Sequence, residues 1–360
     1  MIEQPGLVGL SEIAEMAGVS KQAVTNWRSR HPDFPHPIAE LRSGPVWGRR
    51  DFLAWAEEHQ IPIHVPESKG SREAREGDKM AVTVSLVNMK GGVGKSTLAA
   101  NLGWYCTYRK SKRVLLVDLD PQFNLSQYVL GHTRYEDLIR DGNKTVFHIF
   151  EQLTPAAVSG SPRLQLSPSD VTVNVVPAWE SVSRRLDLLP SQLELAWTLK
   201  NPHDKEQLLK DHLDHVKPDY DLILIDCAPT ESMLTSAAYL ASDYILVPVK
   251  PEFLSTIGLP LLVRSLEEFR MRHKEKEIEL LGIVFNAAGE KLEHGRSRDY
   301  VTKVAADNGW YVFTNEVTFS DSYAKGSRLG RPIFQTDYAR GQKIQEFANV
   351  AEEFCARIGL

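Results

Sequence analysis

The sequence predicts an α/β protein built on a doubly wound, mostly parallel sheet and preceded by a small helical module. A β-branched run at 82–88 passes into a glycine-rich turn and then into a helix-like segment. Apolar runs at 113–118 and 220–226 end in acidic residues, and two more runs lie at 243–249 and 277–286. Buried strands that alternate with helical stretches are typical of parallel sheets with helices on both faces.

Composition limits the possible classes of protein. The chain has 360 residues, of which 42% are hydrophobic and 25% charged, as in an ordinary globular protein. Three widely spaced cysteines, Cys106, Cys227 and Cys355, argue against a disulfide framework and predict a cytoplasmic location. We see no signal peptide and no apolar run near the roughly 20 residues of a membrane span. Because the formal charge is −5, any binding to nucleic acid must come from local basic patches.

The turn at 90–97 reads Lys-Gly-Gly-Val-Gly-Lys-Ser-Thr and stands between a strand and a helix. Its glycines allow successive backbone N–H groups to point at an anion, and the next helix adds its positive dipole end. Lys95 supplies a charge for the outer phosphates, and the Ser96 hydroxyl is a ligand for Mg²⁺. The turn therefore predicts a nucleoside triphosphate site whose lining residues are Lys90, Gly91, Gly92, Val93, Gly94, Lys95, Ser96 and Thr97.

One position departs from the general phosphate-loop pattern. Met89 stands where that pattern has its first glycine, and Lys90 follows it. The loop backbone separates Lys90 from the phosphates of its own subunit, so we expect Lys90 to serve a nucleotide held by another subunit. The whole motif resembles the deviant phosphate loop of the ParA/MinD family of partition ATPases, in which such a lysine acts across a dimer. The resemblance implies ATP and Mg²⁺ as cofactors and a homodimer.

The resemblance runs from about residue 82 to the C-terminus. Asp118 and Asp120 end a buried strand and, being two residues apart, can share one site. The resemblance implies that Asp120 orients the attacking water, that Asp118 supports the magnesium shell, and that Asp226 is the Walker B acid. It also implies that Asn286 contacts adenine. The implied catalytic residues are Lys90, Lys95 and Asp120, and the implied metal residues are Ser96, Asp118 and Asp226.

Residues 1–63 form a predicted (winged) helix-turn-helix domain, joined by a polar linker at 64–80 to the ATPase domain at 81–360. Ser20 caps a predicted recognition helix that ends at Arg30. The layout resembles the MerR and excisionase families, with a β wing at 43–50. A helical hairpin used for dimerisation or protein contacts is the alternative. The expected DNA-contacting residues are Lys21, Gln22, Thr25, Asn26, Arg28, Arg49 and Arg50.

Two regions near the C-terminus bear on whether the protein binds DNA or a membrane. The segment 320–331 aligns with the family's base-side loop and basic surface, so Lys325, Arg328, Arg331 and Arg340 are candidates for sequence-independent DNA contacts, a solvated loop being the alternative. Apolar residues of the last helix are spaced by three and four, and its polar face is acidic, which favours core packing over membrane binding. We also expect Trp179 and Trp197 to lie in the core.

Together these features predict a DNA partition ATPase that is associated with the nucleoid. Its ATP-bound dimer would bind DNA without sequence preference, and a ParB-like centromere-binding protein would stimulate hydrolysis. The N-terminal module could add repression of its own operon. One alternative is a transcription regulator in which ATP is only a switch, and another is a related ATPase that positions a different cargo. No membrane partner is expected.

Overall fold

The computed structural model describes residues 7–10, 13–14, 17, 19–41, 44–59, 61, 80–152, 166–176, 184–200, 205–252, 258–289, 292–337 and 339–360. The chain divides into two compact units, residues 1–73 and residues 74–360, called here the N-terminal and C-terminal units. In the described residues no helix is both long enough and apolar enough to cross a bilayer.

The N-terminal unit packs helices against a small antiparallel sheet of strand order β1-β3-β2. Its elements are β1 (Leu7–Gly9), α2 (Lys21–Arg30), β2 (Ala39–Leu41), β3 (Gly44–Gly48) and α3 (Arg49–Glu58). The Ser20 side chain caps α2 by accepting a hydrogen bond from the Ala23 backbone, as predicted. Val24, Trp47 and Phe52 belong to a core of this unit's own, which explains why so short a segment folds.

The segment predicted as a wing lies in an antiparallel β2–β3 hairpin, and its predicted boundary needs a correction. Arg49 and Arg50 are the first residues of α3, not the end of the wing, because the strand stops at Gly48. Their side chains, like Ser11, Gly18, Arg42 and the linker 64–79, lie outside what the structure describes. Ala17 and Val19 donate backbone hydrogen bonds to Ile13 and Ala14, as a helical turn at this point requires.

The C-terminal unit confirms the predicted α/β class. Its sheet has seven strands in the order β10-β9-β4-β8-β5-β7-β6, all parallel except β6, which pairs antiparallel with β7. The strands are β4 (Val82–Leu86), β5 (Arg113–Leu119), β6 (Val173–Val176), β7 (Arg185–Leu189), β8 (Leu222–Cys227), β9 (Tyr244–Val249) and β10 (Glu279–Phe285).

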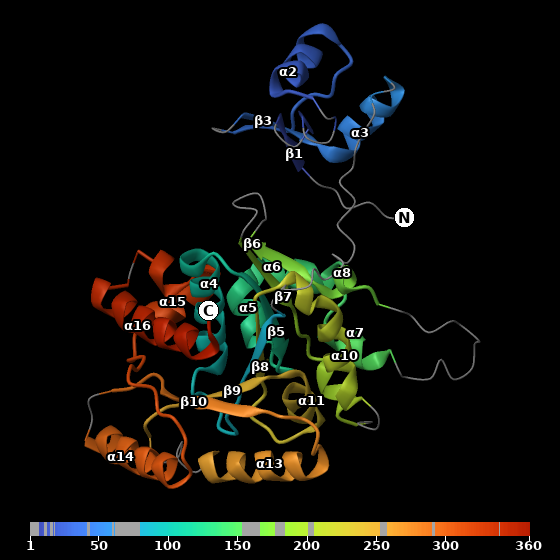
Figure 1. Ribbon diagram of the computed structural model, residues 1–360. Helices are drawn as coiled ribbons and strands as arrows, with labels where there is room; N and C mark the ends of the chain where they lie inside the picture. The colour runs from blue at the N-terminus through green and yellow to red at the C-terminus, as the bar shows by residue number, and fades with distance from the viewer. Residues whose placement is uncertain are drawn as a thin grey trace, which may run out of the picture. The chain divides into compact units, whose positions relative to one another are not determined.

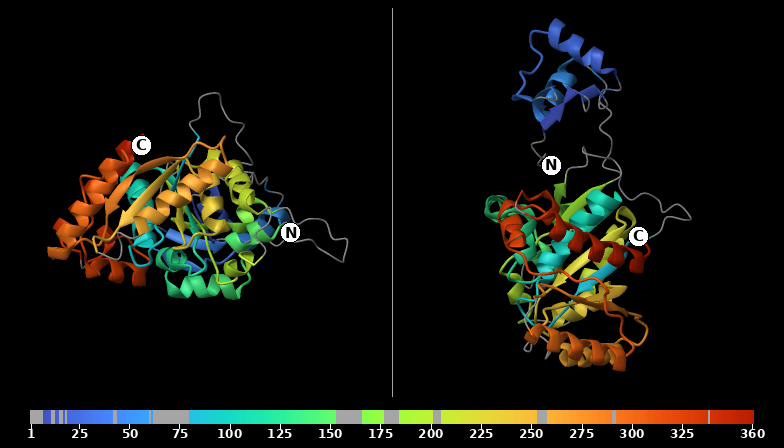
Figure 2. Two further views of the ribbon diagram at one scale, coloured as in Figure 1. Left: turned by 90° about the horizontal axis from the view of Figure 1, so that it is seen from below. Right: turned by 90° about the vertical axis from the view of Figure 1, so that its left-hand side faces the viewer.

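Helices cover both faces of this sheet (Figures 1 and 2). Alternate residues of the central strands enter two separate hydrophobic clusters, because successive side chains of a strand point to opposite faces. One cluster contains residues of α4 (Lys95–Lys110), α5 (Asn124–Leu130), α6 (His132–Arg140) and α16 (Gly341–Ile358). The other contains residues of α7 (Val146–Glu151), α10 (Glu206–Val216), α11 (Met233–Ala241), α13 (Gly258–Arg272) and α14 (Leu292–Asp307).

The remaining elements are short or lie at the sheet margins. They are α8 (Pro168–Val171), α9 (Leu195–Thr198), η2 (Lys217–Asp219), α15 (Asp321–Leu329) and η3 (Ile333–Gln335). The segment predicted as a loop at 320–331 thus contains helix α15, capped by Ser320. Trp197 is 58% exposed, so its predicted place in the core is wrong, and Trp179 lies outside the described residues. Core packing of α16 is confirmed by buried Phe347, Phe354 and Ile358.

Candidate functional site

The turn between β4 and α4 has the backbone shape that its glycines predict. Gly92 and Gly94 have φ values of 75° and 82°, in the left-handed region where glycine carries no steric penalty. A Cβ atom on Gly94 would lie 2.3 Å from Nδ2 of Asn286. Helix α4 begins at Lys95 directly after this turn, so its free N–H groups face the same space.

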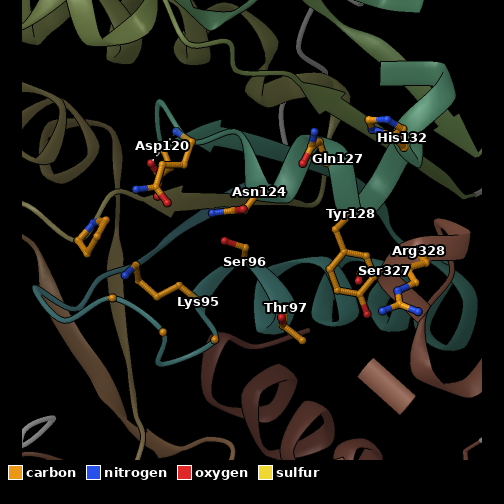
Figure 3. Close-up of a pocket in the computed structure, with 15 residues that line it drawn as sticks. Lys95, Ser96, Thr97, Asp120, Asn124, Gln127, Tyr128, His132, Ser327 and Arg328 are labelled. Carbon is orange, nitrogen blue, oxygen red and sulfur yellow. Dashed lines mark hydrogen bonds between the residues drawn. The ribbon is translucent and has the colours of Figure 1, made fainter. Parts of the chain in front are cut away.

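A cavity of about 520 Å³ opens over the turn (Figure 3), a size suited to a small-molecule ligand. Its walls come from the turn and α4, from the β5–α5 segment and the start of α6, from the segment after β8, and from α15. The lining residues are Gly91, Gly92, Gly94, Lys95, Ser96, Thr97, Asp120, Gln122, Asn124, Gln127, Tyr128, His132, Pro229, Ser327 and Arg328. The structure therefore brings the predicted Lys95, Ser96 and Asp120 together at one cavity.

The two lysines of the turn occupy different environments. Lys95 is buried, and its ammonium group donates to the carbonyl oxygens of Asn88 (3.1 Å) and Lys90 (3.3 Å). Burial lowers the pKa of Lys95, while the charge of Asp226 opposes that shift. Lys90 is exposed and is not among the residues that line the cavity. Of these two lysines, therefore, Lys95 lines the cavity and Lys90 does not.

Two acids meet on neighbouring strands. Asp118 of β5 and Asp226 of β8 are register partners, and both are fully buried. Asp118 accepts hydrogen bonds from the Ser126 backbone (2.8 Å) and hydroxyl (2.6 Å) and from the Asp120 backbone (3.2 Å). Burial raises the pKa of Asp118 to about 7 although these hydrogen bonds oppose the shift. Asp118 is thus held in place behind the cavity rather than among its lining residues.

Asp226 has no such support. Neither of its carboxylate oxygens accepts a hydrogen bond of standard geometry from the described residues. Burial and the nearby Asp118 raise the pKa of Asp226 well above its ordinary value, against the opposing influence of Ser96 and Lys95. A buried carboxylate beside a hydroxyl is an oxygen donor set of the kind that Mg²⁺ prefers. The residues present therefore fit Mg²⁺, which would be held by Ser96 and Asp226.

Asp120 differs from both of these acids because it reaches the cavity. One of its carboxylate oxygens accepts a hydrogen bond from the Gln122 backbone (2.9 Å), which leaves the other available toward the cavity. The φ of Phe123 is 48°, so the chain turns sharply between Asp120 and α5. This turn explains how one short segment supplies both a strand-end acid and the amides of Gln122 and Asn124 to the same wall.

A second hollow, of about 340 Å³, adjoins the first and shares Gly94, Thr97 and Ser327 with it. Asn286, at the end of β10, lines this hollow, and its amide donates to the Val93 carbonyl (2.8 Å). The segment 320–331, which the sequence aligned with the family's base-side loop, supplies part of the other walls, whereas sequence reasoning missed the walls from 317–319, which carry no motif. These walls include Val317, Phe319, Tyr323 and Ala324. The hollow therefore surrounds the predicted adenine contact with partly apolar walls suited to a base.

The predicted DNA-contacting residues fall into separate groups. Lys21, Gln22, Thr25, Asn26 and Arg28 are exposed on one side of α2, while Val24 is buried on the other. In the C-terminal unit Lys325, Arg328, Arg331 and Arg340 are exposed on and after α15. Of these four, Arg328 also lines the cavity over the glycine turn.

The glycine turn, the buried acid on the neighbouring strand and the parallel sheet define a P-loop nucleotide hydrolase. A family model described as an AAA domain, AAA_31, matches residues 81–280, more than half of the chain. An uncharacterized protein of Mycobacterium tuberculosis is 31% identical over 335 residues, covering 91% of this chain and 94% of that protein. The chromosome-partitioning ATPase Soj of Thermus thermophilus is 31% identical over 278 residues, covering 76% and 96%.

Among solved structures, cobyrinic acid a,c-diamide synthase of Mycobacterium smegmatis with a bound ATP analogue and magnesium is similar at a TM-score of 0.54. The two chains are 26% identical over 69% of this chain and 92% of that one. Structural relatives thus hold ATP analogues with magnesium. The chain belongs to the AAA_31 family of ParA/Soj-like partition ATPases, and it is an ATPase.

Proposed function

We propose that this protein is a DNA partition ATPase whose ATP-bound form is a sandwich dimer, released from DNA when a ParB-like partner stimulates hydrolysis. The observation that carries the proposal is the different placement of Lys90 and Lys95 relative to the cavity. Lys95 is buried at the cavity, whereas Lys90 is exposed and is not among the residues that line the cavity. This placement supports a role in which Lys90 contacts the nucleotide bound by a second subunit.

The arrangement assigns a role to each group in phosphoryl transfer to water, in which positioning and charge supply most of the catalysis. Backbone N–H groups of the turn and the Lys95 ammonium hold the phosphates. Asp120 reaches the cavity and orients the attacking water, while Ser126 fixes Asp118 behind it. Mg²⁺, held by Ser96 and Asp226, supplies positive charge to the phosphate oxygens when bound. Asn286 and the adjoining hollow receive the adenine.

Substitution of Lys90 tests the cross-subunit role directly. In Lys90→Ala we expect binding of a fluorescent ATP analogue to the monomer to stay within about threefold of wild type, because Lys90 does not line its own cavity. Dimer formation with a slowly hydrolysed ATP analogue, measured by light scattering after size exclusion, should be lost. Lys303→Ala, an exposed lysine on α14, is the matched control and should dimerise normally. Lys95→Ala should lose nucleotide binding itself.

Persistence of the ATP-dependent dimer in Lys90→Ala would show that Lys90 does not act across the interface. The ATPase assignment would survive that result, because it rests on the family and on the cavity. Loss of both nucleotide binding and dimerisation would instead place Lys90 in the site of its own subunit.

For DNA we propose two surfaces. Lys325, Arg331 and Arg340 would contact DNA backbones when ATP is bound, and each lost phosphate contact lowers the slope of log affinity against log salt by about 0.9. Single alanine variants should therefore weaken binding to unrelated DNA sequences equally and reduce the salt slope. An unchanged slope in all three variants would remove this surface from the proposal.

The exposed amides and cations of α2 would read operator DNA as a helix-turn-helix. The similarity to the Mycobacterium tuberculosis protein cannot be contained in residues 81–360, so part of the N-terminal unit is shared with that relative. Deletion of residues 1–66 separates two functions. If plasmid or chromosome retention persists while promoter repression is lost, partition is the primary role. If retention is normal even when the whole gene is deleted, the protein is an ATP-switched transcription regulator.

A further inference from the structure

We propose that the N-terminal unit binds a divalent transition-metal ion, with Zn²⁺ as the best fit, between His31, Asp33 and His59. One ligand atom of each residue lies within 4.8 Å of the other two. Two imidazoles and one carboxylate are a common ligand set for zinc, which takes four ligands and here would complete its shell with water. The site lies outside the ATPase site and does not depend on the function proposed above.

The hydrogen bonds of His59 prepare it as a ligand. Its Nδ1 atom lies 3.0 Å from the Trp55 carbonyl oxygen, which can only accept, so Nδ1 carries the proton. This leaves Nε2 with a lone pair in the neutral ring. A backbone carbonyl that fixes the tautomer of a histidine in this way is the usual outer support of a metal-bound imidazole.

The Asp33 carboxylate is also held in place by a hydrogen bond from a residue outside the proposed ligand set. The Trp55 indole donates a hydrogen bond to Oδ2 of Asp33 (3.1 Å), and the same oxygen lies 3.1 Å from Nε2 of His59. In a tetrahedral zinc site, neighbouring ligand atoms are about 3.3 Å apart, given bonds of about 2.0–2.1 Å. The spacing therefore suits two atoms that share one metal ion. The competing explanation is an ion pair between Asp33 and protonated His59.

The position of the site indicates what it would do. His31 is the C-cap of α2 and His59 is the C-cap of α3, so a metal ion would join the ends of two helices. A cation at helix C-termini is favoured by both helix dipoles. Trp55, whose ring stacks on His59 at 4.4 Å between centroids, ties the site to the core of the unit. Metal binding would thus fix the orientation of α2, the proposed recognition helix.

Metal titration of the full-length protein tests the proposal. The protein is stripped with a chelator and then titrated with Zn²⁺, or with Co²⁺ as a spectroscopic probe, in excess Mg²⁺ and ADP so that the nucleotide site is occupied. We expect one Zn²⁺ per chain, and the visible absorption of Co²⁺ in a tetrahedral nitrogen and oxygen shell. Loss of an outer-shell partner costs about 10- to 100-fold in affinity, so loss of a direct ligand in His59→Gln should cost at least about 100-fold.

Two further variants make the result decisive. Asp33→Asn keeps the shape of the side chain but removes its charge, and it should also weaken Zn²⁺ binding. His36→Gln, in the same turn but exposed and outside the cluster, is the matched control and should bind as wild type does. Far-ultraviolet circular dichroism of each variant reports on folding. The proposal is overturned if wild type shows no saturable Zn²⁺ binding, or if folded His59→Gln binds as tightly as wild type.

Discussion

Buried His212 should make the stability of the C-terminal unit fall in mild acid. His212 lies on α10, and its Nε2 atom has no hydrogen-bond partner among the described residues. Burial, with a smaller effect of His215, lowers its pKa from 6.5 to about 4. Between these two values the unfolded chain binds a proton that the native protein does not, so stability falls as the pH falls, by about 1.4 kcal/mol per pH unit. From about pH 7.5 to about pH 5 the loss is about 2 kcal/mol.

Urea unfolding of the nucleotide-free protein at both pH values measures this effect. His212→Leu should lose about 2 kcal/mol less than wild type between the two pH values, because leucine does not titrate. His215→Gln removes an exposed histidine from the same helix and should behave nearly as wild type. The raised pKa of Asp118 changes stability in the opposite sense, but it is common to all three proteins and cancels in the comparison. An equal pH dependence in His212→Leu and wild type would refute the reasoning.

Three more substitutions have definite expected outcomes. Asp226→Asn should raise the stability of the magnesium-free protein by about 1–2 kcal/mol at neutral pH, since it removes a carboxylate whose charged form is disfavoured by burial and by Asp118, while abolishing magnesium-dependent ATP hydrolysis. Gly94→Ala should lose ATP binding in a calorimetric titration, because φ is 82° and the new Cβ would meet Asn286 at 2.3 Å. Glu353→Ala should lower the urea midpoint by the equivalent of about 2 kcal/mol, because the backbone and side-chain amides of Asn315 lose their acceptor.

The strands and the phosphate turn could be predicted because their signals are local. A continuous apolar run ending in an acid is enough to place Asp118 and Asp226 at the edge of a parallel sheet, and the glycine spacing is enough to place Lys95. Strand β7 was not predicted because it is short and contains Asp187, which is buried with an ion pair to Arg185 and hydrogen bonds from Asn174 and Tyr220. Asn174 and Tyr220 lie far from Asp187 in the sequence, so no local pattern predicts these two hydrogen bonds.

The exposure of Trp197 also could not be predicted from the local sequence. Aromatic residues are usually buried, yet Trp197 lies on the four-residue helix α9, makes an edge contact with Phe147 and stays 58% exposed. Which side of so short a helix faces the sheet is decided by tertiary packing, not by spacing. The same holds for Asn286, whose residue type and strand position were predictable. Its hydrogen bond to the Val93 carbonyl follows only from the juxtaposition of β10 with the turn.

The register between β5 and β8 limits how this site can change in evolution. Asp118 faces Asp226, and the pairs on either side, including Val117 with Ile225, are apolar. Because side chains alternate between the two faces of a sheet, an insertion or deletion of one residue in either strand would send its acid to the opposite face. Connecting segments carry no such restriction. A scan of single-residue deletions should therefore find these two strands intolerant, and relatives should differ in length between the strands rather than within them.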